Sequence, residues 1–427
     1  MNTTFTALAI QQATEQYQQI RARTETICQP LEPEDTVVQP IVDVSPPKWH
    51  MAHTSWFFET FLLQPHLSGY KPFHKQYSYL FNSYYNSVGS RVQRDQRSTL
   101  TRPPLRDVYA YRQHVDEHMQ RLFKQLDEGK DKSKLAELLS LVQLGLQHEQ
   151  QHQELLITDI KYILSTNPLL PVYKRPLHQP ENSKATKASF LEIPGGTYTV
   201  GFQGEGFSFD NELGVHEVLL ADFRIMNRLV TNGEYLEFIQ DGGYGDFRHW
   251  LDEGFALVHT QHLEAPLYWV KQQDEWCRFT MHGLEKINPN DPVCHLNFYE
   301  ANAYANWAGK RLLTEFEWEA ASQVHPPTGG NFVERGRLEP SAAEPAVKGV
   351  QQLYGDVWEW TYSAYHPYPR FEKAPGAIGE YNGKFMLNQM VLRGGSCATS
   401  ESHIRTTYRN FFHPEKRWQY NGIRLAQ

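Results

Sequence analysis

SKLAELLSLVQLGLQHEQQHQELLITDIKYILS, residues Ser133–Ser165, decides the fold of the first part of the chain. Leucine and isoleucine recur at intervals of three and four residues on both sides of the polar block His148–Glu154. This period is typical of an amphipathic helix, so the segment predicts one long, deeply packed helix. Polar side chains in the middle of a buried helix are costly without partners or a function. The polar block therefore needs a specific explanation.

The two histidines of the block stand four residues apart. Residues at i and i+4 share a helix face, so His148 and His152 can present two imidazole nitrogens to one point. This arrangement is half of a metal site, and the alternative is a solvated helix face rich in Glu and Gln. Glu154 lies two residues past His152 and points away from that face, which favours a supporting role over metal ligation.

A third ligand is expected from the segment that contains His50 and His53. A helix that buries Trp49, Ala52 and Trp56 carries His53 on the same side, so His53 is the predicted ligand and His50 the fallback. A site with three histidines and an open side suits Fe(II) as well as Zn(II).

Three further helices are expected before Ser133–Ser165. They are predicted at Ala7–Thr26, from Pro46-Pro47 onward, and at Leu105–Gly129, since proline is tolerated in a first helical turn and glycine often follows a last one. Four helices predict a bundle over residues 1–170, and bundle cores commonly build metal sites. The proline-rich stretch that follows predicts a linker at 171–188.

From residue 189 to 427 the sequence changes to short alternating runs broken by Gly, Asn, Asp and Pro. We expect an irregular α+β domain with two short helices, Asn232–Gln240 and Phe298–Ala308, and mostly turn and loop elsewhere. Trp358-Glu359-Trp360 is interpreted as buried scaffold, and Arg393-Gly394-Gly395 as a tight turn.

The bulk properties favour small molecules as partners. A formal net charge of −8 and a pI near 6.2 argue against a nucleic-acid partner. Four cysteines without a CxxC pair predict a reduced, cytoplasmic setting. We expect no membrane association, because the sequence has neither a signal-peptide pattern nor a long apolar run.

Two groups of motifs resemble known families. WHMAHTSWFFE (49–59) and HEQQHQE (148–154) resemble the DinB-like helical bundle, whose HxxxHxE motif and upstream histidine bind a metal. The second part resembles the formylglycine-generating-enzyme fold, a C-type-lectin-related domain, in IPGGTYTVG (193–201), NWAGKRLLTEFEWEAA (306–321), GDVWEWT (355–361), VLRGGSC (391–397) and GIRLA (422–426). The two modules in this order resemble the ergothioneine-biosynthesis sulfoxide synthases.

The resemblance implies a non-haem Fe(II) enzyme that uses O2 to join a thiol sulfur to the imidazole of hercynine, the trimethylammonium betaine of histidine. In that family the iron ligands match His53, His148 and His152. Residues that hold hercynine match Gln151, Asn410 and Phe411, and aromatic faces attract quaternary ammonium groups. A solvent-facing glutamine is the alternative for Gln151.

The identity of the thiol depends on the branch of the family. The branch that uses γ-glutamylcysteine carries Trp-Asp where this chain has Phe411-Phe412. A second branch, which the resemblance implies can use free cysteine, has a tyrosine pair that matches Tyr84-Tyr85. Either tyrosine would donate a proton, or a proton with an electron, since a phenol with a pKa of about 10 stays protonated. Aromatic loop packing is the alternative for the pair.

Two arginines follow the tyrosine pair, Arg91 and Arg94. Guanidinium groups bind carboxylates in a bidentate manner, so we expect these two to hold the carboxylate of the thiol substrate. A solvated loop is the alternative. Cysteine and γ-glutamylcysteine both remain candidate donors.

The sequence is compatible to different degrees with three other functions. A formylglycine-generating enzyme would need a late pair of copper-binding cysteines, and residues 398–427 contain none. A selenium-transferring, selenoneine-type synthase acting on hercynine shares the architecture and remains an alternative. A non-catalytic lectin-like binding protein is the third alternative, but it leaves the three histidines unexplained.

Overall fold

The computed structural model describes residues 3–128, 132–175, 186–345, 347–373, 379 and 382–427. The chain divides into two compact units, of which the first reaches Pro168 and the second begins at Leu169. Most of the predicted linker lies outside the described residues, as does the predicted helix end at Gly129, so the boundaries at 171 and 188 stay predictions. No helix within the described ranges has both the length and the apolar character needed to cross a membrane.

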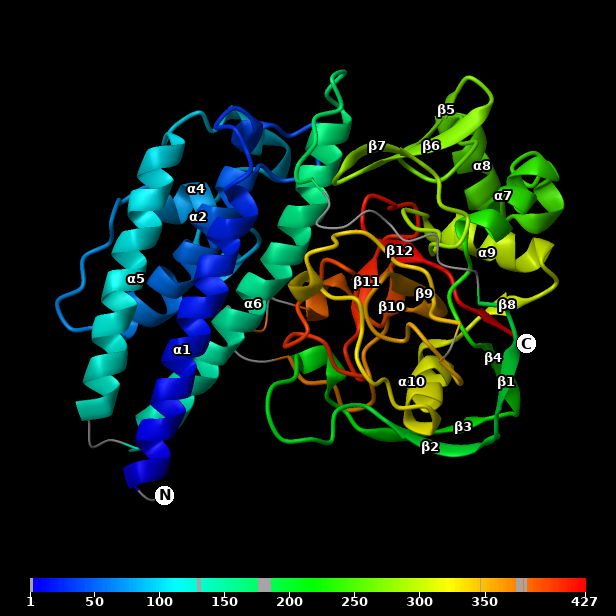
Figure 1. The fold of residues 1–427 in the computed structure, drawn as a ribbon. Coiled ribbons are helices and arrows are strands. Elements are labelled where there is room, and N and C mark those ends of the chain that lie inside the picture. Colours follow the sequence, from blue (N-terminus) through cyan, green and yellow to red (C-terminus); the bar gives the residue numbers. More distant parts are fainter. Residues whose placement is uncertain (1–2, 129–131, 176–185, 346, 374–378, 380–381) are drawn as a thin grey trace. The chain divides into compact units, whose positions relative to one another are not determined.

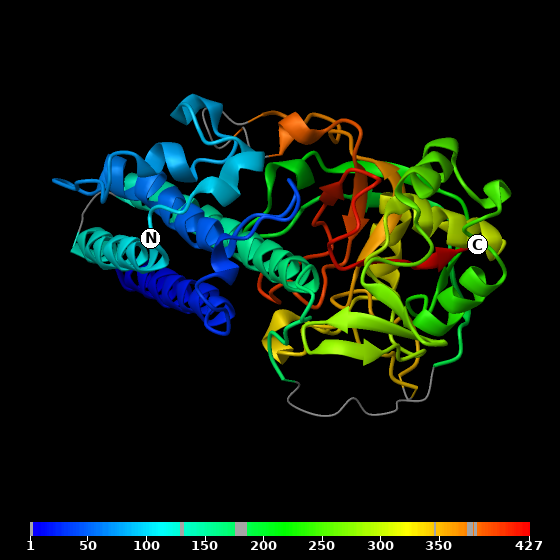
Figure 2. The ribbon, with the colours of Figure 1, turned by 90° about the horizontal axis from the view of Figure 1, so that it is seen from above.

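The first unit is a four-helix bundle. Its helices are α1 (Thr3–Cys28), α2 (Pro47–Phe58), α5 (Leu105–Glu128) and α6 (Lys132–Ser165). Both α1 and α2 contact α5 and α6, which closes a ring of four (Figure 1), and Figure 2 gives the view from above. Pro47 occupies the first position of α2, where a missing N–H costs no hydrogen bond. The predicted bundle is confirmed, with helix limits within a few residues of those expected.

Smaller elements connect α2 to α5. A π-helical turn, Glu59–Leu63, extends α2 and leads into α3 (Gln64–His66), and α4 (Tyr77–Phe81) follows. One 3-10 turn, Asp35–Val37, precedes α2, and two others, Asn86–Val88 and Arg94–Thr99, lie between α4 and α5. The segment from α4 to the last of these turns carries the predicted tyrosine pair and the predicted arginines.

A buried ionic network crosses the bundle at Glu149. This carboxylate is 0 % exposed and accepts hydrogen bonds from Arg21 Nη1 at 3.0 Å, Arg112 Nη2 at 3.1 Å and Thr24 Oγ1 at 2.7 Å. Burial alone would raise the pKa of Glu149, but Arg21 and Arg112 outweigh it and hold that pKa below its ordinary value. The network also reaches α2, because Arg112 donates to Met51 O at 3.0 Å.

Gly145 lets α2 and α6 approach closely. A Cβ atom at Gly145 would lie 2.7 Å from Phe58 Cε1 and 3.0 Å from Phe57 Cε1, and both rings are buried. Contacts this short do not occur for real side chains, so only glycine allows the observed packing. The contact lies one helical turn before His148.

In the part of the chain that the structure describes, the second unit contains four sheets and four α-helices. The sheets have the strand orders β1-β4-β13-β8, β11-β10-β9-β12, β2-β3 and β5-β6-β7. The strands are β1 (Phe190–Ile193), β2 (Gly196–Val200), β3 (His216–Leu220), β4 (Phe223–Met226), β5 (Trp269–Gln272), β6 (Glu275–Thr280), β7 (Gly283–Lys286), β8 (Arg311–Leu312), β9 (Trp358–Ala364), β10 (Met390–Arg393), β11 (Asn410–Phe412), β12 (Asn421–Gly422) and β13 (Leu425–Ala426).

The helices of this unit exceed the predicted two. The expected helices occur as α7 (Asn232–Gln240) and α9 (Phe298–Trp307), but α8 (Asp252–Gln261) and α10 (Glu315–Val324) were not predicted. The signal for α10 was present, because Thr314 and Glu317 form a capping box in which Glu317 N donates to Thr314 Oγ1.

Buried arginines and tryptophans form the interior of the second unit. Trp358 and Trp360 are each 1 % exposed, and the Trp360 indole donates to Leu296 O at 2.9 Å, in agreement with a scaffold role. Gly394 and Gly395 have φ of 99° and 81°, which suits glycine in the predicted turn. The unit therefore has its own core.

Replacing Gly145 by alanine should destabilise the bundle. At an exposed helical position this change would stabilise a protein by about 0.5–1 kcal/mol. Here the added methyl group meets two buried rings, and overpacking of this kind costs about 1–3 kcal/mol. We expect a lower melting temperature for Gly145→Ala than for the unaltered protein. Ser140→Ala, at an exposed position of α6, is the control and should not lower it. A raised melting temperature for Gly145→Ala would contradict the packing argument.

Candidate metal centre

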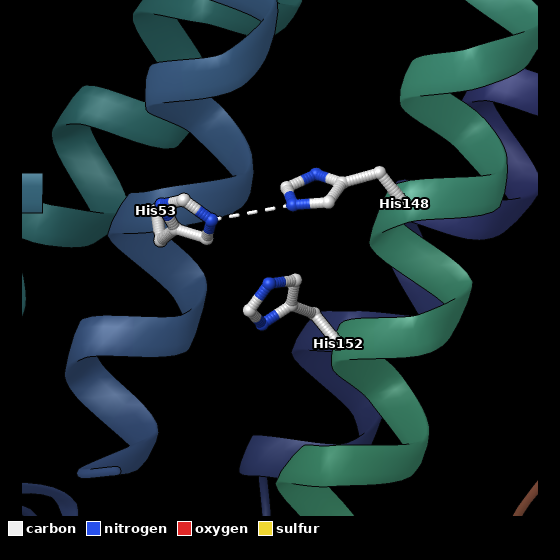
Figure 3. A group of neighbouring side chains, drawn as sticks. All are labelled: His53, His148 and His152. Atoms are coloured by element: carbon white, nitrogen blue, oxygen red, sulfur yellow. Dashed lines mark hydrogen bonds between the residues drawn. The ribbon is translucent and has the colours of Figure 1, made fainter. Parts of the chain in front are cut away.

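Three histidines from two helices converge in the bundle (Figure 3). His53 lies on α2, and His148 and His152 lie one turn apart on α6; one nitrogen from each ring falls within 4.8 Å of the other two. The Nε2 atoms of His53 and His148 are 3.2 Å apart. His53 and His148 are fully buried and His152 is partly buried. This burial excludes the solvated helix face as an explanation, and the group could hold a metal ion.

The tautomer of His53 is set by the backbone. Its Nδ1 lies 2.6 Å from Phe81 O, and because a carbonyl only accepts, Nδ1 carries the proton. Burial, with the neighbouring His148, lowers the pKa of His53 well below its ordinary value, so the ring is neutral. Its Nε2 therefore keeps a lone pair, which faces His148 (Figure 3).

The other two imidazoles are also held neutral. Burial lowers the pKa of His148 to about 3, and burial together with His53 and His148 lowers the pKa of His152 well below its usual range. Neutral imidazole is the form that binds metals. Three such donors without a thiolate fit a divalent ion such as Fe(II) or Zn(II) that keeps coordination positions open.

His50, the fallback ligand, does not join the group. Its Nδ1 lies 2.8 Å from Nδ1 of His152, and its Nε2 lies 3.0 Å from Oδ2 of Asp159. The structure thus places His50 beside a member of the group rather than within it. Glu154, which was expected to point away, is partly buried on α6.

Aromatic rings enclose His53. Trp49 stacks on one face at a centroid distance of 4.5 Å and Trp56 lies nearly parallel at 5.4 Å. The predicted tyrosines pack next to Trp56. The ring centroid of Tyr85 lies 5.5 Å from that of Trp56, and Tyr85 stacks on Tyr84 at a centroid distance of 4.9 Å. Tyr85 is buried and Tyr84 only partly so. The tyrosine pair is therefore packed against the same aromatic group that holds the His53 ring.

A third arginine, Arg97, was not expected from the sequence and contacts the Trp49 ring that stacks on His53. Arg91 and Arg94 are exposed and donate to Asn86 Oδ1 and Asp43 O. Arg97 is buried, lies 3.4 Å from the centre of the Trp49 ring, and its Nε has no hydrogen-bond partner among the described residues.

Its electrostatic surroundings are unfavourable for a cation. Burial, and then the charges of Arg94 and Arg91, lower the pKa of Arg97, while the carboxylate of Asp159 acts in the opposite direction. Nη1 of Arg97 donates to Ser45 Oγ at 2.7 Å, which leaves Nε as the buried N–H that a further acceptor could satisfy. The regular spacing of Arg91, Arg94 and Arg97 can be seen in the sequence, but the burial of Arg97 cannot.

The expected hercynine-binding residues lie in different units. Gln151 is partly buried on α6 between the two histidines. Asn410 and Phe411 lie on β11 in the second unit, where Phe411 stacks on Tyr365 at 4.2 Å with an interplanar angle of 11°. The Asn410 side chain accepts a hydrogen bond from Phe411 N at 2.9 Å. Phe411 thus belongs to a flat aromatic pair, which is a suitable surface for a quaternary ammonium group.

Comparison with known proteins defines the class. Residues 16–156 match the DinB superfamily, and residues 176–347 and 335–427 match the sulfatase-modifying factor enzyme 1-like domain. The protein is thus a two-domain member of a class that joins a DinB-type bundle to a sulfatase-modifying-factor-like domain, and the predicted fold class is confirmed.

Individual relatives narrow this class. The chain is 35 % identical over 310 residues to the hercynine oxygenase of Mycolicibacterium smegmatis, covering 66 % of this chain and 70 % of that protein. It is 38 % identical to the hercynine oxygenase of Mycobacterium tuberculosis over 52 % of this chain and 56 % of that protein. A formylglycine-generating enzyme of Thermomonospora curvata is 28 % identical over 55 % of this chain and 92 % of its own length. The chain belongs to the hercynine oxygenase family.

Metal-free protein should lose stability as the pH falls below about 6.5. The pKa of His148 is about 3 in the folded state, whereas a histidine in the unfolded chain titrates near 6.5. Between these values only the unfolded state takes up the proton, so the stabilisation is complete above about 6.5 and decreases by up to about 1.4 kcal/mol per pH unit below it.

Melting temperatures in a chelator, from about pH 7.5 to about pH 5.5, measure this effect. His148→Phe, which cannot take up the proton, should show a shallower fall than the unaltered protein. Equal slopes for the two proteins would contradict the assignment of a buried, neutral His148.

Proposed function

We propose that the protein is a non-haem Fe(II)- and O2-dependent sulfoxide synthase that joins the thiol of cysteine to the imidazole of hercynine in ergothioneine biosynthesis. Membership of the hercynine oxygenase family confirms the predicted class of oxidative enzyme. The observation that supports the metal dependence is the group of three neutral, buried histidines. The four cysteines are buried and form no disulfide, which suits the reducing cytoplasm in which we place the reaction.

His53, His148 and His152 would hold the iron through one nitrogen each. When bound, iron would supply open coordination positions and would pass electrons to O2 from the thiol and the imidazole, which are the groups that are oxidised. The protein contributes rigid placement, because Trp49 and Trp56 clamp the His53 ring. Holding two reacting groups side by side can lower a barrier by about 7–11 kcal/mol.

The residues expected to bind hercynine offer different chemistry in each unit. Gln151, between the ligand histidines, offers an amide for the polar part of the substrate. Phe411, supported by its stack with Tyr365, offers an aromatic face for the trimethylammonium group, and Asn410 precedes it on the same strand.

The carboxylate of the thiol substrate would bind the arginines. Arg91 and Arg94 are the residues expected from the sequence, and we add Arg97 because its buried Nε has no hydrogen-bond partner among the described residues and could donate to a carboxylate. Free cysteine is the preferred donor, since Phe412 stands where the γ-glutamylcysteine branch has an acidic residue. Arg97 stacks on Trp49, and Trp49 stacks on His53, so the bound carboxylate would lie beside the metal ligands.

Tyr84 is the preferred proton donor of the tyrosine pair. Its side chain keeps part of its surface exposed, whereas the Tyr85 ring is buried against Trp56 and Phe61. A phenol that substrates can reach can transfer its proton during C–S bond formation. Tyr85 would hold Tyr84 in place through the stack between their rings.

A direct test begins with anaerobic loading of Fe(II), followed by O2, hercynine and one of three donors: cysteine, γ-glutamylcysteine or a selenosugar. We expect mass spectrometry to find the sulfoxide of the cysteine adduct as the main product. His148→Ala should lose iron retention and O2 consumption, while His259→Ala, at an exposed position of the second unit, should keep both. Full activity of His148→Ala would reject the iron site, and a main product from the selenosugar would reject the donor assignment.

Removing the phenol hydroxyl should redirect the reaction. General acids contribute about 100-fold or more to rates, so Tyr84→Phe should form sulfoxide about 100-fold more slowly and release oxidised thiol instead. Tyr85→Phe keeps the ring stack and should change the ratio of products much less. The ratio of sulfoxide to oxidised thiol, measured by mass spectrometry, compares the two variants. An unchanged ratio in Tyr84→Phe, or the larger change in Tyr85→Phe, would contradict this role for Tyr84.

A further inference from the structure

A chain of three buried groups leads away from the histidine cluster. The imidazole of His152 lies 2.8 Å from His50, Nδ1 to Nδ1, and Nε2 of His50 lies 3.0 Å from Oδ2 of Asp159. The same carboxylate oxygen accepts the backbone N–H of Ser45 at 2.8 Å. His50 and Asp159 are each 2 % exposed. Neither residue belongs to the three-histidine group.

The direction of each hydrogen bond follows from Asp159. Oδ2 of Asp159 already accepts the N–H of Ser45, so it is the acceptor in its contact with His50, and His50 donates to it through Nε2. Neutral His50 has one N–H, and its Nδ1 is then an acceptor for the proton on His152 Nδ1. Neutral His152 in turn keeps a lone pair on Nε2, the nitrogen that points toward the space between His53 and His148 (Figure 3).

We propose that Asp159 and His50 are positioning residues that hold His152 in the one tautomer able to bind metal through Nε2. The inference rests on the proposed metal centre. His53 needs no such partner, because the carbonyl of Phe81 already sets its tautomer. His152 is the least buried of the three histidines, so it depends most on a fixed partner.

The positions of His50 and Asp159 also explain why an imidazole, rather than a carboxylate, contacts His152 directly. A metal-binding histidine usually donates its second N–H to a carboxylate, a carbonyl or water. Here Asp159 lies too far along α6 to contact His152, and His50 from α2 bridges the two groups. Because the bridge spans both helices, it sets the proton position and the ring orientation together.

The discriminating variants are His50→Gln and His50→Phe. Glutamine offers one acceptor and one donor, so it can accept from His152 and donate to Asp159 as His50 does. Phenylalanine fills a similar space and offers neither. A purely structural role would depend on volume, whereas the proposed role depends on the hydrogen bonds.

Affinity for Co(II), measured on the full-length metal-free chain by competition with a chromophoric chelator, is the readout. We expect His50→Phe to weaken Co(II) binding by about 10–100-fold and His50→Gln to restore most of it. Melting temperatures of the metal-free forms report whether each variant folds. Equal affinity of His50→Phe and the unaltered protein overturns the proposal. Equal weakening in His50→Gln and His50→Phe overturns it too, because packing alone would then explain the effect.

A second measurement needs no variant of His50 or Asp159, and it covers the case in which His50→Phe does not fold. Long-range 15N NMR of histidine-labelled, metal-free protein distinguishes the two tautomers, and the signals of His152 are those missing in His152→Asn. We expect the proton on Nδ1, and a proton on Nε2 overturns the proposal. Both readouts are independent of sulfoxide formation. A chain that makes no sulfoxide can still pass them, and a chain that fails them can still be a sulfoxide synthase.

Discussion

The carboxylate of Glu149 is the interaction on which the first unit depends. It is fully buried, and its partners Arg21 and Arg112 come from α1 and α5. Both arginines also donate to α2, so one network on α6 joins all four helices. A buried ion pair adds little net stability, but it allows few alternative arrangements, because displacing one partner leaves a charge uncompensated. Glu149 follows His148 directly, so the network sets the rotation of α6 that turns His148 and His152 toward α2.

This frame carries the candidate metal centre. The group His53, His148 and His152 is kept neutral because low polarity around the rings disfavours their charged forms. Around it are the groups that determine where the protons sit, the carbonyl of Phe81 and the ring of His50. Close packing of α2 and α6 brings the three histidines and these groups together.

The second unit holds its candidate binding residues in a similar way. Glu315, at the start of α10, accepts hydrogen bonds from Arg393 on β10 and from Arg409, which immediately precedes β11. These buried pairs fix the strand that carries Asn410 and Phe411. The proposed binding residues of both units thus stand next to fully buried ion pairs, which limit their movement.

Sequence alone determined what depends on local geometry. The 3.6-residue period predicted the bundle helices, and the four-residue spacing placed His148 and His152 on one face, because both are properties of a single helix. The tertiary structure decided which histidine of α2 completes the group, that Arg97 is buried beside it, and that Glu149 joins four helices. The physical reason is that these outcomes depend on how helices rotate and approach one another. That packing brings together side chains far apart in the chain, and no local pattern specifies it.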